Sequence, residues 1–134
     1  MIVVDSNVLA YSLIEGDKTG LARQARERDP DWRVPSLWRH EFLNILASYG
    51  RVRGATAKQL TSLWSQAVNL FVTAERSVDF PYALRLAVEH KISAYDAEFI
   101  ALAKVLQVPC ITEDKALQRR FPRDTLSLES FVRR

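Results

Sequence analysis

The stretch MIVVDSNVLAY, residues 1–11, contains the pattern on which the fold depends. Residues 2–4 are β-branched, as in a strand that is buried on both faces. This run ends in the carboxylate of Asp5 instead of a turn glycine, and residues 6–14 then have the composition of a short helix. The N-terminus therefore predicts a buried strand that presents an acid at its end and leads directly into a helix.

Strands and helices are predicted to alternate along the rest of the chain. Hydrophobic periodicity predicts further helices near residues 19–28, 36–49, 57–70, 79–89, 94–107 and 114–120, and strands near 32–34, 70–74, 109–112 and 125–128. Gly50 and Gly54 are expected to bound a basic turn after the third helix. Such alternation predicts an α/β fold, a three-layer α/β/α sandwich with a central parallel sheet, and the length fits one domain over residues 1–134.

The composition is that of a globular protein with a small positive charge. Hydrophobic residues make up 48%, and 19 Lys and Arg stand against 16 Asp and Glu, giving a net charge of +3. The longest apolar stretch, residues 8–14, is far shorter than the ~20 residues that cross a bilayer, and no secretory signal is recognisable. We therefore expect a cytoplasmic protein without a membrane partner, in which the single cysteine, Cys110, is a buried thiol.

Four acids lie at positions where a surface carboxylate is not expected. Asp5 and Asp114 each follow an apolar strand, and the carboxyl ends of parallel strands form the ligand-binding edge of such sheets. Glu41 and Asp96 share helical faces with apolar residues, where a lone carboxylate is costly unless it is paired or binds a metal. We expect the four to meet in one pocket.

Each acid also has a simpler explanation when it is considered alone. Asp5 and Asp114 directly precede predicted helices and would serve as N-caps. Ion pairs are the simpler explanation for the other two acids, with Arg39 or His40 for Glu41 and with Lys104 or a neighbouring arginine for Asp96.

As a set, the four carboxylates are the oxygen donors that Mg²⁺ or Mn²⁺ prefers. No zinc-site spacing, glycine-rich phosphate loop or GxSxG elbow is present. Without these acids the remaining charge is more strongly positive, which favours a polyanionic partner.

Four motifs, in this order, resemble those of a known family. They are VVDSNVLAY at the N-terminus, HEFLNIL around Glu41, SAYDAEFIALA around Asp96 and ITEDKAL around Asp114. Over essentially its whole length the chain resembles the PIN-domain nucleases, and within them the small VapC-type toxins of toxin–antitoxin pairs.

This resemblance implies a parallel α/β/α sandwich, a Mg²⁺ or Mn²⁺ centre, and an endoribonuclease that acts on RNA and is restrained by an antitoxin. A homodimer is also expected. The residues that match the acidic quartet, which is both catalytic and metal-binding, are Asp5, Glu41, Asp96 and Asp114. The residues that match polar positions around the quartet are Asn7, Asn44 and Thr112.

Two other functions remain open from the sequence. One is a PIN-like protein that binds or processes RNA without being a toxin. The other is an aspartyl phosphotransferase or phosphatase, but these commonly have a DxD motif after the first strand, and the third residue here is Asn7. A phospho-accepting domain would also need a lysine at a late strand end, whereas Lys115 follows Asp114 at a helix start.

The predicted helix at residues 57–70 has a wider apolar face than one sheet contact needs. Its members are Leu60, Leu63, Trp64, Ala67, Val68 and Phe71. Core packing would explain this face, and the alternative is a groove for an antitoxin segment or a second copy of the chain.

Overall fold

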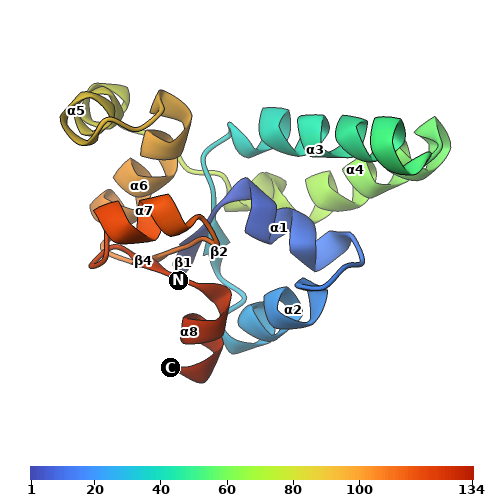
Figure 1. Ribbon diagram of the computed structural model, residues 1–134, viewed down its shortest axis with the longest axis horizontal. Coiled ribbons are helices and arrows are strands. Elements are labelled where there is room, and N and C mark those ends of the chain that lie inside the picture. Colours follow the sequence, from blue (N-terminus) through green and yellow to red (C-terminus); the bar gives the residue numbers. More distant parts are fainter.

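A computed structural model describes all of residues 1–134, which form a four-stranded parallel sheet flanked by helices (Figure 1). The strands are β1 (Ile2–Val4), β2 (Trp32–Arg33), β3 (Cys110–Ile111) and β4 (Thr125–Leu126), in the sheet order β2-β1-β3-β4. The helices are α1 (Ser6–Leu13), α2 (Thr19–Arg28), α3 (Trp38–Arg53), α4 (Ala57–Phe71), α5 (Phe80–His90), α6 (Ala94–Leu106), α7 (Lys115–Arg120) and α8 (Leu128–Arg133), with a 3₁₀ turn at Val72–Ala74.

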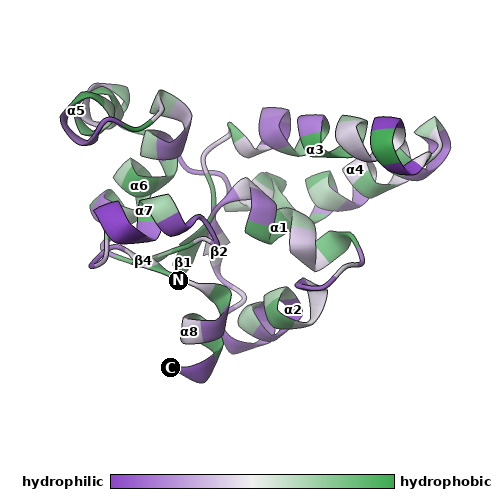
Figure 2. Cartoon of the chain, viewed as in Figure 1, coloured by the Kyte–Doolittle hydropathy of each residue, from purple (hydrophilic) through white to green (hydrophobic).

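Alternating side chains of β1 build two cores, one on each face of the sheet. Ile2 and Val4 pack in a cluster with residues of α1–α4 and α8, whereas Val3 packs with residues of α5, α6 and α7. Figure 2 shows that α6 is largely hydrophobic along its length and that the more peripheral α7 is largely hydrophilic. The expected three-layer α/β/α sandwich is thereby confirmed.

The sheet order places the ligand-binding edge between β1 and β3. From β1 the chain crosses to β2 on one side, and later to β3 and then β4 on the other side. The strand order therefore reverses between β1 and β3, where the carboxyl ends of neighbouring parallel strands leave a crevice.

The strand expected at residues 70–74 is absent, because α4 runs to Phe71 and a 3₁₀ turn follows. Phe71 lies on the same helical face as Ala67 and stacks on Trp32 with ring centroids 5.8 Å apart, so tertiary packing favours the helix. All that remains of the expected pairing is one parallel bridge between Val34 and Glu75.

Two other boundaries differ from expectation. The last strand ends at Leu126, and Ser127 caps α8 by accepting the N–H of Ser130, so the C-terminus is a short helix that periodicity did not reveal. Helix α3 continues through Gly50 and ends at Arg53, and its C-cap is Gly54, which has a positive φ of 69°. Gly50 instead allows close helix packing, since a Cβ there would lie 3.1 Å from Leu60 Cδ1 of α4.

None of the helices has both the length and the apolar character needed to span a bilayer.

Candidate active site

All four singled-out acids lie at the N-terminal ends of helices. Asp5 is the N-cap of α1 and Asp114 is the N-cap of α7. Glu41 and Asp96 lie in the first turns of α3 and α6. Because the N-terminal end of a helix carries a partial positive charge, this arrangement partly offsets the repulsion among the acids.

The four acids line a single cavity of about 720 Å³. Its other polar residues come from the same helix starts, so elements far apart in sequence meet here (Figure 1). The polar lining residues are Asp5, Ser6, Asn7, His40, Glu41, Asn44, Tyr95, Asp96 and Asp114. This arrangement agrees with the expectation that the four acids share one pocket.

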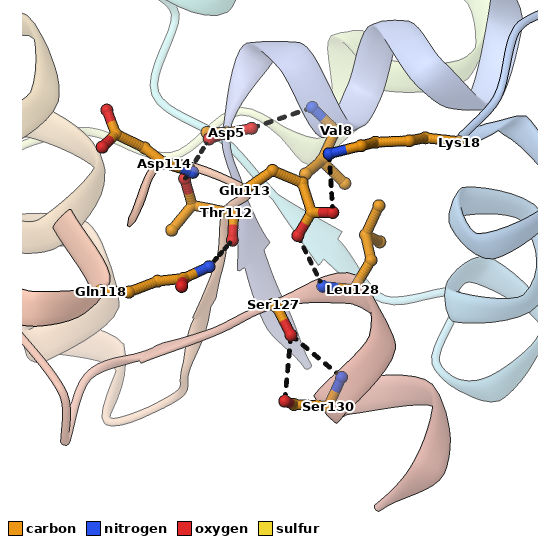
Figure 3. Close-up of polar contacts among 10 residues, drawn as sticks. All are labelled: Asp5, Val8, Lys18, Thr112, Glu113, Asp114, Gln118, Ser127, Leu128 and Ser130. Atoms are coloured by element: carbon orange, nitrogen blue, oxygen red, sulfur yellow. Dashed lines mark hydrogen bonds and ion pairs between the residues drawn. The ribbon is translucent and has the colours of Figure 1, made fainter. Parts of the chain in front are cut away.

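One threonine hydroxyl fixes two of the acids. Thr112 Oγ1 donates to Asp5 Oδ2 at 2.5 Å and accepts the backbone N–H of Asp114 at 3.1 Å (Figure 3). Asp5 Oδ1 meanwhile accepts the N–H of Val8 at 2.9 Å. Thr112 is fully buried and does not line the cavity itself, but it bonds to two residues that do.

A serine hydroxyl fixes a third acid. Ser6 Oγ donates to Glu41 Oε1 at 2.8 Å and joins the first residue of α1 to the first turn of α3. Ser6 is only 4% exposed, so the bond is largely shielded from water. Sequence reasoning missed Ser6, although its place between Asp5 and Asn7 in the first motif was the available signal.

No base pairs with any of the four acids. The cations proposed as partners bind elsewhere: Arg39 contacts Glu75 at 2.6 Å, and Lys104 contacts Asp124 at 2.9 Å. The ion-pair explanation for Glu41 and Asp96 is therefore wrong. The N-cap explanation for Asp5 and Asp114 is correct, and capping occupies one oxygen of each carboxylate while they line the cavity.

Burial and mutual repulsion make three of the acids harder to ionise. Burial raises the pKa of Asp5 from 3.8 to about 6, with repulsion from Glu41 and Asp114 adding to it and the hydrogen bonds from Thr112 and Val8 opposing it. Burial, followed by repulsion from Asp96, raises the pKa of Glu41. Burial and then repulsion from Asp114 raise the pKa of Asp96. Repulsion thus connects the four acids in a closed ring.

The oxygens left over by these bonds fit a hard cation. Ser6 holds one oxygen of Glu41 and the α7 cap holds one oxygen of Asp114, so each retains a free oxygen. No three of the acids converge closely enough to form a ready-made metal cluster. Mg²⁺ is usually held by one or two carboxylates and keeps several of its waters, so binding does not require three converging acids.

The expected orientation of Glu41 needs correction. Helix α3 buries Trp38, Phe42 and Leu46, whereas Ile45, which lies one turn after Glu41, is only partly buried. The helix is therefore rotated so that Glu41 lies at the border between core and cavity.

The polar residues expected around the quartet divide into two groups. Thr112 bonds to Asp5, whereas Asn7 and Asn44 are exposed, line the cavity and have no hydrogen bond to an acid. His40 and Tyr95 also line it, although neither was singled out as a site residue from the sequence. Each directly precedes an acid in the sequence, and that adjacency was the available signal.

The comparisons with known proteins agree with this geometry. Ribonuclease VapC3 of Pyrobaculum aerophilum is 27% identical over 128 residues, which cover 90% of this chain and 95% of that protein. The crystal structure of PAE2754 from Pyrobaculum aerophilum has the same fold, with a TM-score of 0.77 at 17% identity, covering 98% of this chain and 92% of that one. The family model of the PIN domain matches residues 2–122, so this chain belongs to the PIN domain family.

Proposed function

We propose that this protein is a metal-dependent endoribonuclease that hydrolyses RNA phosphodiester bonds. The observation that carries the proposal is the group of four carboxylates without ion-pair partners, which line one cavity at the carboxyl edge of the sheet. The similarity to a protein named as a ribonuclease supports RNA as the substrate.

The residues that would hold Mg²⁺ or Mn²⁺ are Asp5, Glu41, Asp96 and Asp114. When bound, such an ion lowers the pKa of water and neutralises charge at the scissile phosphate. The chain's own contribution is to hold the carboxylates in place, through the hydroxyls of Thr112 and Ser6. The helix starts around the cavity also favour an anionic phosphate beside the acids.

The decisive experiment measures cleavage of labelled RNA by purified protein. Asp5→Asn and Asp96→Asn should each abolish cleavage in Mg²⁺ or Mn²⁺ without unfolding the protein, and EDTA should do the same to the wild type. The matched control is Glu27→Gln, an exposed acid of α2 without an ion pair, which should cleave normally. Full activity of the wild type in EDTA would refute a metal-dependent reaction.

Product ends give an independent readout. Hydrolysis by water leaves 5′-phosphate and 3′-hydroxyl ends, whereas contaminating metal-independent ribonucleases that use the ribose 2′-OH leave cyclic phosphates. RNA binding without cleavage under these conditions would instead favour the non-catalytic alternative.

We further propose that an antitoxin restrains the activity by docking on α4. Only Ala67 and Phe71 of its six apolar residues are buried, and a cavity of about 410 Å³ opens beside Leu60 and Leu63. An apolar segment of a partner would fit such a groove, and exposed Arg51 at the end of α3 favours an acidic one.

Growth of a bacterial host tests the toxin role. Expression of the wild type should stop growth, and Asp96→Asn should not. Leu63→Arg should remain toxic but escape neutralisation by a co-expressed antitoxin, while Ser65→Arg, at an exposed position of the same helix outside this cavity, should remain neutralised. Neutralisation of both variants would place the antitoxin elsewhere.

The exposed face of α5 is our proposed dimer surface. Phe80, Leu84 and Val88 recur one helical turn apart and are 65%, 61% and 70% exposed. Arg85 and Glu89 lie beside this stripe and supply charges of both signs, as a self-complementary surface requires. Leu84→Glu should convert a dimer to a monomer in light scattering, whereas Val105→Glu, which is equally exposed on α6, should not.

A further inference from the structure

Tyr95 is an exposed aromatic residue at the acid cavity. Its side chain is 62% exposed, and it alone among the exposed large hydrophobic residues lines this cavity. It directly precedes Asp96 in the first turn of α6, and it has no aromatic or hydrogen-bonding partner within the chain. The ring is therefore free to contact whatever enters the cavity.

The other walls of the cavity offer unpartnered polar groups. Asn7 lies in the first turn of α1, and His40 and Asn44 lie on α3, and all three are exposed lining residues without an intramolecular side-chain hydrogen bond. Amide and imidazole groups recognise the edges of bases. One cavity thus combines a free aromatic ring, free polar groups and the four acids.

These features fit a nucleotide whose base is unpaired. Proteins bind single strands by stacking aromatic side chains on bases, whereas the bases of an RNA duplex are already stacked and paired. The volume of about 720 Å³ lies within the usual range of ligand pockets, roughly 300 to 1,000 Å³.

We propose that Tyr95 stacks on one base of single-stranded RNA next to the scissile phosphate, and so helps to determine which RNA is cleaved. This inference rests on the proposed ribonuclease function. Because Tyr95 neighbours Asp96 in sequence, the stacked base would be held beside the phosphate that faces the acids.

The test uses a single-stranded RNA oligonucleotide that the wild type cleaves, and a series of copies with one abasic nucleotide each. For the wild type, one abasic position next to the cleavage site should lower kcat/KM by roughly 5- to 150-fold, the size of one stacking contact. Tyr95→Ala should show the same loss on the intact oligonucleotide and no further loss with that abasic copy. Tyr95→Phe retains a ring and should behave like the wild type.

The matched control is Val105→Ala, which shortens an apolar side chain that is 59% exposed and lies outside both the acid cavity and the proposed dimer surface. It should leave kcat/KM and the abasic profile unchanged. The stacking proposal would be overturned if Tyr95→Ala cleaves normally, or if the losses of kcat/KM caused by the mutation and by the abasic nucleotide are additive. Either result would leave the ribonuclease function intact. If the wild type cleaves no RNA, the proposed ribonuclease function fails. Fluorescence anisotropy then measures binding of the same oligonucleotides, and the stacking proposal is refuted if Tyr95→Ala binds them as tightly as the wild type does.

Discussion

Replacing Asp5 by asparagine should stabilise the metal-free protein at neutral pH. In the folded chain the pKa of Asp5 is raised from 3.8 to about 6 by burial and by repulsion from Glu41 and Asp114. At about 1.4 kcal/mol per pKa unit, ionised Asp5 costs the fold roughly 3 kcal/mol above pH 6. Asparagine carries no charge and still accepts the N–H of Val8, but it loses the charge-assisted bond from Thr112. We therefore expect a net gain of about 1–2 kcal/mol, or ~3–8 °C in Tm.

The sign of the pH dependence follows from the same pKa. Because the folded-state pKa of Asp5 lies above its unfolded value, protonation favours the fold, and this cost is lost as the pH falls from about 6 towards 3.8. Between pH 7 and pH 5 the wild type should gain about 1.3 kcal/mol from this residue alone. Asp5→Asn has no carboxylate to protonate at this position, so its stability advantage over the wild type should be smaller at pH 5 than at pH 7 by the same amount.

Urea unfolding in EDTA at pH 7 and pH 5 measures both quantities. The matched control is Asp79→Asn, which changes the exposed N-cap of α5, where no cluster of acids lies nearby and asparagine caps equally well. Millimolar Mg²⁺ or Mn²⁺ should then stabilise the wild type more than Asp5→Asn, so the two stabilities should converge. The reasoning would be refuted if Asp5→Asn is less stable than the wild type in EDTA and this deficit does not change with pH or metal. Asp5 would then act only as a helix cap.

The remaining predictions concern the bonds that hold the acids and the packing of α3. Thr112→Val should lower the free energy of unfolding by about 1–3 kcal/mol and reduce kcat, because Asp5 loses a hydrogen bond and the Asp114 N–H loses its acceptor. Thr112→Ser keeps the hydroxyl group and should restore both the stability and kcat. Urea unfolding and cleavage rates measure the two effects. The cleavage rate at subsaturating Mg²⁺ should rise as the pH increases through about 6, because Asp5 must ionise before it binds a cation, and a pH–rate profile that is flat from pH 5 to 7 would contradict this. Gly50→Ala should lower Tm, since the added methyl group would lie 3.1 Å from Leu60 Cδ1, and the loss should disappear in a Leu60→Ala background.

The local features of the fold were predictable from neighbouring residues. The β-branched run at residues 2–4 predicted β1, and the acids placed after β1 and β3 were correctly expected at one edge of the sheet. Helix N-capping by Asp5 and Asp114, which the structure shows, was also among the explanations that the sequence suggested. Each of these features depends on residues within a turn or two of one another, together with the general rule that parallel strands end at the same edge.

Contacts between distant segments were not predictable in the same way. The bonds from Ser6 to Glu41 and from Thr112 to Asp5 join residues 35 and 107 positions apart. The length of α4 depended on the stacking of Phe71 on Trp32, which overrode a strand-like composition.

What the sequence determined by itself is therefore the alternation of elements, with one acid after each of two strands and one on the apolar face of each of two helices. Only the tertiary structure decided how far α3 turns Glu41 from the core to the cavity, and that Tyr95 and His40 border the same space. The physical reason is that a helical period of 3.6 residues identifies an apolar face only to within a residue or so. The final rotation of each helix is set by the side chains of its neighbours, which the chain brings together only when it folds.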